Sequence, residues 1–124
     1  IKMFDAFRTA EAQWKLWKQT TDENFIAHPK KGSPHSRGVA IDLTLIKKNN
    51  YELNMGTSFD CFSSKSFHGN MEISRDAQKN RFILLGIMLA AGWDFYKKEW
   101  WHYQLFDSKK YKLIKNGMLK EPIM

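Results

Sequence analysis

The chain has 124 residues, of which 43% are hydrophobic and 15% aromatic, and it carries a formal net charge of +7. This length and composition predict one globular domain, residues 1–124, with a core of its own, and exclude a disordered chain. The lysines stand in pairs spread over several turns and loop ends, and no nucleic-acid-binding motif accompanies them, so no nucleic-acid partner is expected.

Residues 1–8 alternate loosely between apolar and polar side chains, which predicts a first strand. Thr9 follows as an N-cap, and a helix is expected over residues 10–20. Trp14 and Trp17 repeat at helical spacing within it. We therefore expect this helix to bury one aromatic face in the core rather than to display a binding platform.

A loop with two prolines and a glycine, residues 24–34, leads into an apolar strand over residues 38–45. Asp42 interrupts that strand with a carboxylate, which needs a cation, a set of amides or a metal as its partner, because burying an unpaired charge is costly. Residues 51–55 are predicted to form the hairpin partner of this strand. Residues 56–70 have no clear period and form a long loop, of the kind that often carries function.

Ser74 is the predicted N-cap of a second helix, which ends at Gly92 in the C′ position. The second half of this helix is apolar nearly all round, so it is expected to be the central buried helix. Residues 93–106 are dense in aromatic side chains and read as a strand. The elements predict an α+β fold: a small, mostly antiparallel sheet with two main helices packed on it.

Cys61 is the one cysteine of the chain and cannot form an internal disulfide. This favours a reducing, cytoplasmic compartment, although a periplasmic protein without disulfides is equally allowed. The longest apolar run, residues 82–93, is too short to span a bilayer, so no membrane span is expected.

Two short stretches hold the candidate site residues. His35 lies seven residues before Asp42, and Glu99 lies three residues before His102. Two imidazoles and one carboxylate, with a fourth position open, are the ligand set of a catalytic zinc ion. Because positions three apart on a regular strand face opposite sides, Glu99 must lie at the start of the strand or on a bulge to serve the same site as His102. The spacings alone leave both a zinc site and a purely structural histidine open.

Three ordered motifs give the chain a family resemblance. Residues 33–42 match the pattern S-x-H-x-x-G-x-A-x-D, residues 99–102 match E-x-W-H, and residues 5–8 are similar to the start of D-x-Y-R-P, with Phe for Tyr and a following Thr for Pro. With M-G-T-S-F-D at residues 55–60, the chain resembles the zinc-dependent D-alanyl-D-alanine dipeptidases of the vancomycin-resistance type, within the zinc D,D-peptidase superfamily.

The resemblance implies one Zn²⁺ in a cleft on the sheet and assigns a role to seven residues. The implied zinc ligands are His35, Asp42 and His102, the implied general base is Glu99, the arginine that steadies the oxyanion is Arg8, and the implied substrate-binding residues are Ser33 and Asp60. Arg37 is expected to brace its loop, and His68 to lie on the surface or to line the cleft.

The implied activity is hydrolysis of the small dipeptide D-Ala-D-Ala. A D,D-carboxypeptidase or peptidoglycan endopeptidase of the same superfamily, and a non-enzymatic zinc-containing binding module with a basic surface, stay open as alternatives. The resemblance leads us to expect a further segment before the D-x-Y-R-P region, which residues 1–124 do not include. Association with such a segment and the oligomeric state are therefore left open.

Overall fold

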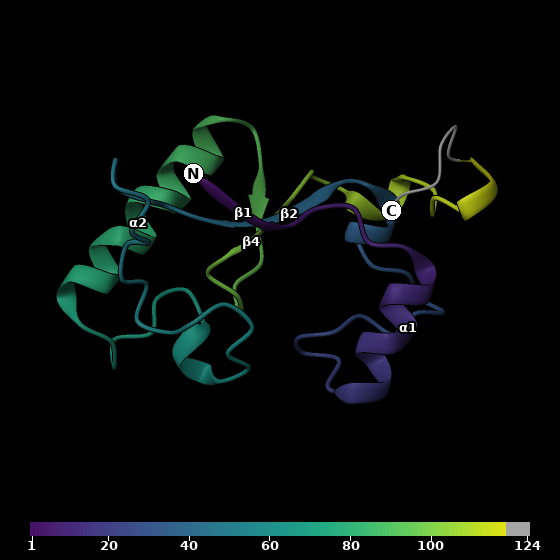
Figure 1. The fold of residues 1–124 in the computed structure, drawn as a ribbon, viewed down its shortest axis with the longest axis horizontal. Coiled ribbons are helices and arrows are strands. Elements are labelled where there is room, and N and C mark those ends of the chain that lie inside the picture. Colours follow the sequence, from purple (N-terminus) through teal and green to yellow (C-terminus); the bar gives the residue numbers. More distant parts are fainter. Residues whose placement is uncertain (119–124) are drawn as a thin grey trace.

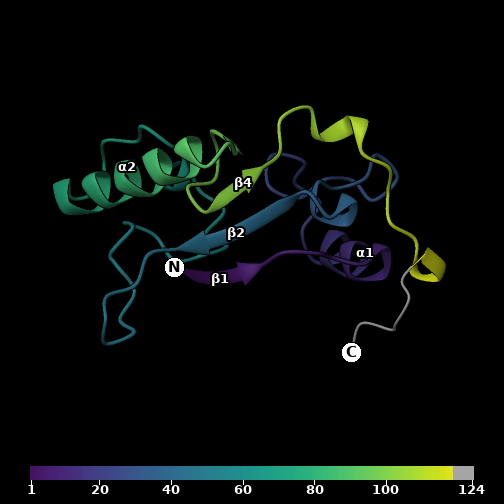
Figure 2. The same cartoon turned by 90° about the horizontal axis from the view of Figure 1, so that it is seen from above.

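The structure is a computed structural model that describes residues 1–118, and it confirms the predicted α+β fold. One antiparallel sheet has the strand order β1-β2-β4-β3. The elements are β1 (Lys2–Asp5), α1 (Ala10–Gln19), β2 (Ala40–Thr44), α2 (Arg75–Ala90), β3 (Asp94–Phe95) and β4 (His102–Gln104). The two helices lie at opposite ends of the molecule with the sheet between them (Figures 1 and 2). In the described residues, neither helix is long and apolar enough to cross a membrane.

β2 is the strand that carries Asp42, and it is paired on both sides, by β1 and by β4. The predicted strand over residues 38–45 is therefore confirmed with slightly shorter bounds. Its predicted hairpin partner, residues 51–55, is reduced to one isolated bridge between Ile46 and Glu52. The polar turn between them brings the chain back, but the sheet does not extend to that side.

α1 begins where the sequence predicts, because the Thr9 hydroxyl accepts a hydrogen bond from the helix's first turn. The expectation that this helix buries its tryptophans is wrong. Trp14 is 40% exposed and, with Trp17, flanks the ring of His28, whereas the buried side chain of α1 is the polar Gln13. Helical spacing shows which side chains share a face, but not which face meets the rest of the protein.

α2 is capped by the Ser74 hydroxyl and is followed by Gly92, whose φ of +87° is the left-handed conformation of a C′ glycine. Leu84 and Met88 face the core. The expectation that this is the central buried helix is nevertheless wrong, because only one of its faces is covered. Several of its large apolar side chains are exposed, namely Phe82, Ile83, Ile87 and Leu89. The sheet is too small to cover more than one face of the helix.

The aromatic stretch over residues 93–106 is a hairpin and not the single strand that was expected. β3 and β4 pair through Asp94 with Gln104 and through Phe95 with Tyr103, and a turn separates them. This hairpin and α2 enclose the main core, whose buried members are Leu43, Met55, Leu84, Met88, Trp100, Trp101 and Tyr103. Aromatic residues of this hairpin and of the turn before β4 therefore supply much of the core that anchors it.

Arg81 of α2 is 3% exposed and donates three hydrogen bonds to backbone carbonyls of the loop that follows residue 54. Its Nε bonds the carbonyl of Met55 at 2.6 Å, its Nη2 that of Lys65 at 2.8 Å, and its Nη1 that of Phe67 at 3.1 Å. Burial lowers the pKa of this guanidinium to about 10, which leaves it charged at neutral pH. One side chain thus holds both ends of the loop over residues 55–67.

Candidate metal centre

Three acidic or basic side chains lie in a row across the sheet. The β1–β2 pairing places Asp5 opposite Asp42, after a register irregularity in β1, and the β2–β4 pairing places Asp42 opposite His102. Directly opposed residues on neighbouring strands project from the same face of a sheet. The strand register therefore brings Asp42 and His102 together although they are 60 positions apart in the chain.

His35 joins this row from the 3₁₀ turn His35–Arg37, which precedes β2. Gly38 ends the turn with a φ of +69°, a conformation that a residue with a Cβ rarely adopts. The ring nitrogen Nδ1 of His35 lies 2.6 Å from the carbonyl oxygen of Ala6 and donates to it, since a carbonyl can only accept. The unprotonated Nε2 of His35 is left to face the sheet.

The ligand atoms of His35, Asp42 and His102 converge on one point. His35 Nε2 lies 3.2 Å from His102 Nδ1 and 3.3 Å from Asp42 Oδ2, and His102 Nδ1 lies 3.0 Å from Asp42 Oδ1. A tetrahedral zinc ion with ligand bonds of about 2.0–2.1 Å separates its ligand atoms by about 3.3–3.4 Å. The three side chains, all buried, therefore have the spacing of one face of such a site.

The electrostatics of the cluster favour an ionised Asp42. Burial alone would raise its pKa, but hydrogen bonds with His102 and His35 outweigh that effect and lower the pKa to about 2. Two neutral imidazole nitrogens and one carboxylate are donors that a divalent cation binds readily. The described residues thus fit a metal ion in both geometry and charge.

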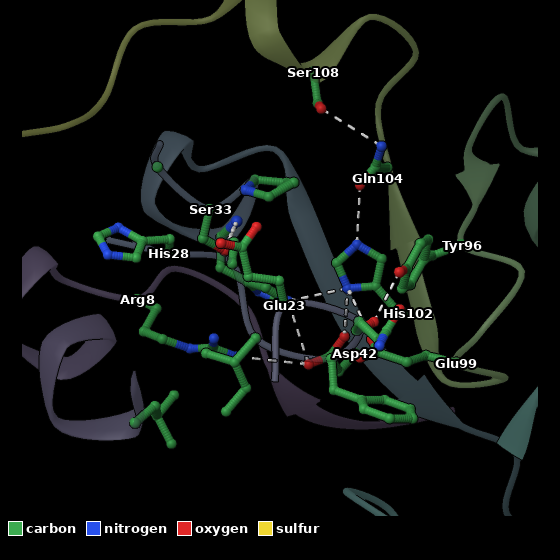
Figure 3. A pocket seen from close by; sticks show the side chains of 18 of the residues that line it. Arg8, Glu23, His28, Ser33, Asp42, Tyr96, Glu99, His102, Gln104 and Ser108 are labelled. Carbon is green, nitrogen blue, oxygen red and sulfur yellow. Dashed lines mark hydrogen bonds and ion pairs between the residues drawn. The ribbon is translucent and has the colours of Figure 1, made fainter. Parts of the chain in front are cut away.

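Arg8 lies beside the cluster, and all three of its guanidinium nitrogens donate hydrogen bonds. Its Nε and Nη2 donate to Asp5 Oδ2 at 2.9 and 2.5 Å, and its Nη1 donates to Gln13 Oε1 at 3.0 Å. Its Nη2 is also 3.9 Å from Asp42 Oδ2. Figure 3 shows the Arg8 side chain extended towards Asp42. Asp5 and Gln13 therefore fix a permanently charged, planar donor next to the ligand cluster.

Glu99 lies in the turn just before β4, which is the position that the three-residue spacing to His102 demanded. It is 6% exposed, and its Oε2 is 3.9 Å from His102 Nδ1. Burial raises the pKa of Glu99 to about 8, and the nearby carboxylates of Asp42 and Asp60 add to that effect. A carboxyl group with a raised pKa in a cleft is a candidate for proton transfer.

The structure brings all seven predicted site residues into one cleft of about 620 Å³. Asp60 reaches it from the middle of the long loop, where its φ of +59° is unusual for a residue other than glycine, and burial raises its pKa. Ser33 also lines the cleft, and its hydroxyl accepts a hydrogen bond from the backbone N–H of His35 at 3.2 Å. Ser33 thus also helps to shape the turn that carries His35.

The two further sequence expectations have different outcomes. Arg37 braces its loop as expected, because its guanidinium donates to the carbonyls of Lys31, at 3.1 Å, and of Tyr111. His68 lies outside this cleft, and its ring packs against those of Phe95 and Tyr103. The expectation that His68 lines the cleft is therefore wrong, and the alternative of a surface histidine holds only in part, since the side chain is half-buried.

The burial of His68 predicts a pH dependence of stability. Burial lowers its pKa from the ordinary 6.5 to about 4, so between these values the unfolded chain binds a proton that the folded chain does not. The contribution of His68 to the free energy of unfolding should therefore fall by about 2–3 kcal/mol as the pH drops from 6.5 to 4, and it has to be separated from the contributions of other groups with shifted pKa values. Urea unfolding in the presence of a chelator, across this range, measures the effect.

The variant His68→Gln isolates this contribution. Glu99, with its raised pKa, contributes an opposite slope between its ordinary value of 4.5 and about 8, but it is the same in both proteins and cancels in their difference. The difference in unfolding free energy between the two proteins should vary with pH between 4 and 6.5 and stay constant above. A difference that is constant throughout would contradict the assignment.

Sequence reasoning assigned no role to Asp5, although it begins the motif at residues 5–8, and it missed Gln13 and Gln104. Asp5 and Gln13 position Arg8, and Gln104 Oε1 lies 3.0 Å from His102 Nε2. Gln104 had a readable signal, since residues two apart on a strand face the same side. The role of Gln13 had none, because helical spacing gives no account of a buried polar contact across the fold.

Comparisons with known proteins identify the family of the chain. The family model described as D-ala-D-ala dipeptidase matches residues 1–119. The chain is 37% identical over 114 residues to the D-alanyl-D-alanine dipeptidase of Escherichia coli, an alignment that covers 92% of this chain and 59% of that protein. It is 46% identical over 76 residues to the D-alanyl-D-alanine dipeptidase of Enterococcus faecium, covering 60% of this chain and 38% of that protein.

The match extends over nearly the whole chain but over only part of these relatives, since the chain spans 59% of the length of the Escherichia coli protein. All seven predicted site residues lie within the stretch that the family model matches. The chain belongs to the D-Ala-D-Ala dipeptidase family of peptidases.

Proposed function

We propose that this chain is a zinc-dependent peptidase that hydrolyses D-Ala-D-Ala or a close D,D-dipeptide. The observation that carries the proposal is the convergence of His35, Asp42 and His102, with ligand atoms 3.0–3.3 Å apart and the carboxyl group of Glu99 beside them in one cleft. Family membership supports the substrate class.

The three ligands would hold one zinc ion, and a zinc ion supplies Lewis acidity that acidifies water and polarises a peptide carbonyl. Glu99 serves as the base. It accepts a proton from water as the water oxygen bonds to the peptide carbonyl carbon, and it then returns this proton to the nitrogen of the leaving D-alanine, whereupon the C–N bond breaks. Its burial keeps competing water away from the proton that it holds.

Arg8 and Asp60 would act on the substrate itself. The guanidinium of Arg8, fixed by Asp5 and Gln13, stabilises the negative charge that develops on the carbonyl oxygen. The carboxylate of Asp60 pairs with the free ammonium group that distinguishes a dipeptide from an interior peptide bond. Ser33, which also lines the cleft, contacts the substrate as well.

The test combines metal analysis with two substrates. After zinc loading, elemental analysis should find one zinc ion per chain, and D-Ala-D-Ala should be hydrolysed while its N-acetylated form is not, because Asp60 then has no ammonium group to bind. A chain that keeps its activity after exhaustive chelation contradicts the proposal. Zinc binding without hydrolysis of either substrate favours the binding-module alternative.

A D,D-carboxypeptidase is the second candidate, and the size of the cleft favours it. A volume of about 620 Å³ lies within the range of about 300–1,000 Å³ that suits drug-sized ligands, and a dipeptide of two alanines is much smaller. Hydrolysis of the N-acetylated dipeptide, or of a longer acylated peptide ending in D-Ala-D-Ala, at a rate matching that of the free dipeptide identifies this activity instead.

A further inference from the structure

We propose that Gln104 is a positioning residue of the metal centre, which holds His102 in the tautomer and orientation that a metal ligand needs. The inference rests on the proposed function, since it concerns the same zinc site. Neither the family motifs nor the ligand cluster includes Gln104, which lies two residues beyond the end of the E-W-W-H stretch.

The backbone of β4 places the two side chains together. His102 and Gln104 are the first and last residues of this strand and, two positions apart, project from the same face. Gln104 Oε1 lies 3.0 Å from His102 Nε2, on the side of the ring that faces away from Asp42. Figure 3 shows the ring of His102 between the two, with a contact on each side.

The role follows from the chemistry of a neutral imidazole, which has one protonated nitrogen and one lone pair for a metal. The atom of His102 that faces Asp42 and His35 is Nδ1, so Nδ1 must be the unprotonated one when it binds a metal. Gln104 Oε1 can only accept a hydrogen bond, and it therefore stabilises the tautomer with the proton on Nε2.

The other end of the Gln104 amide is held by Ser108. The amide nitrogen of Gln104 lies 3.4 Å from the Ser108 hydroxyl oxygen and donates to it, in the orientation that leaves the amide oxygen facing His102. Ser108 is buried in the 3₁₀ turn Ser108–Lys110. His102, Gln104 and Ser108 are therefore linked by two successive hydrogen bonds, the second of which ends at the 3₁₀ turn.

The two imidazoles of the cluster are supported in different ways. The Nδ1–H of His35 donates to a backbone carbonyl, that of Ala6, which no substitution at that position removes. The Nε2–H of His102 donates to a side chain, and this support can be deleted by mutation. Substituting Gln104 therefore measures how much a hydrogen-bond partner of a ligand histidine contributes to metal affinity.

The test compares the zinc dissociation constants of purified full-length variants by competition with a chromophoric chelator. Gln104→Leu should bind zinc about 10–100-fold more weakly, as expected for loss of a hydrogen-bond partner behind a metal-bound histidine. Gln104→Glu, which keeps the acceptor, should bind within about threefold of the parent or more tightly. The matched control is Gln78→Leu in α2, away from the cleft. It removes an amide that donates to the carbonyl of Ile73, just before the helix, and should leave zinc affinity unchanged.

Two further readouts separate positioning from a structural role. The metal-free unfolding midpoint of Gln104→Leu should match that of the parent, and its Co²⁺-loaded form should show an altered d–d absorption spectrum, which Gln104→Glu restores. If Gln104→Leu does not fold, the hydrogen-bonded ring N–H of His102 in the zinc-loaded parent, observed by NMR, takes its place: an Nδ1–H signal instead of an Nε2–H signal overturns the proposal.

The outcomes also separate this inference from the proposed function. A parent protein that binds no zinc overturns both. A parent that binds zinc, together with a Gln104→Leu variant that binds it equally well or that loses affinity only as much as Gln78→Leu, overturns the role of Gln104 alone.

Discussion

Replacing Glu99 by glutamine is expected to lower the turnover of D-Ala-D-Ala by about 10²–10⁴-fold, the usual contribution of a general base. The amide keeps the shape of the buried side chain but cannot accept the proton of the attacking water. Zinc should stay bound, since Glu99 is not one of the three converging ligands. Steady-state kinetics on the zinc-loaded variant, with zinc content measured on the same sample, checks both statements.

The raised pKa of Glu99 makes its role as a base depend on a bound metal ion. With a pKa of about 8, the metal-free side chain is mostly protonated at neutral pH and cannot serve as a base. A divalent cation held by the neighbouring ligands would favour its ionised form, because an opposite charge lowers the pKa of a carboxyl group. The exposed Glu72 supplies the control, and Glu72→Gln should leave turnover unchanged. A Glu99→Gln variant that turns over within about threefold of the parent would remove Glu99 from the mechanism.

The second large effect is expected for Asp42→Asn, which should weaken zinc binding by more than about 100-fold, since even the loss of an outer partner costs about 10–100-fold. The substitution keeps the size of the side chain but removes the negative charge between the two imidazoles. Chelator competition gives the dissociation constant, and turnover at limiting zinc should fall in parallel.

Asp94→Asn is the matched control for this charge change. Asp94 lies in β3 of the same sheet, outside the cleft, and its carboxylate accepts a hydrogen bond from the backbone N–H of Phe95. Its substitution should leave zinc affinity within about threefold of the parent. Equal zinc affinity in the parent and in Asp42→Asn would exclude Asp42 as a ligand and, with it, the proposed site.

Local signals predicted the parts of the fold that depend on neighbouring residues. The caps at Thr9 and Ser74 were correct because capping is a contact between residues three positions apart. The burial of Trp14 and the reading of residues 93–106 as one strand were wrong for a shared reason. Burial and strand length depend on the size of the whole sheet, which a local pattern does not contain.

The residues of the candidate site could be predicted from the sequence, but the side chains that position them could not. A carboxylate in an apolar strand and a Glu three residues before a His were visible at Asp42, Glu99 and His102, and the family resemblance supplied their roles. The side chains behind them come from elsewhere in the chain. Asp5 is brought opposite Asp42 by strand register, and Gln13 by the packing of α1, and neither relation is encoded in spacing.

The triple hydrogen bonding of Arg81 has a consequence for engineering this family. The loop that presents Asp60 is fastened at Met55, Lys65 and Phe67 to one residue of a helix far along the chain. Replacing this loop with that of a relative, to alter which peptide is accepted, will succeed only where the recipient helix carries an arginine at the position of Arg81. The loop and this arginine therefore have to be exchanged together.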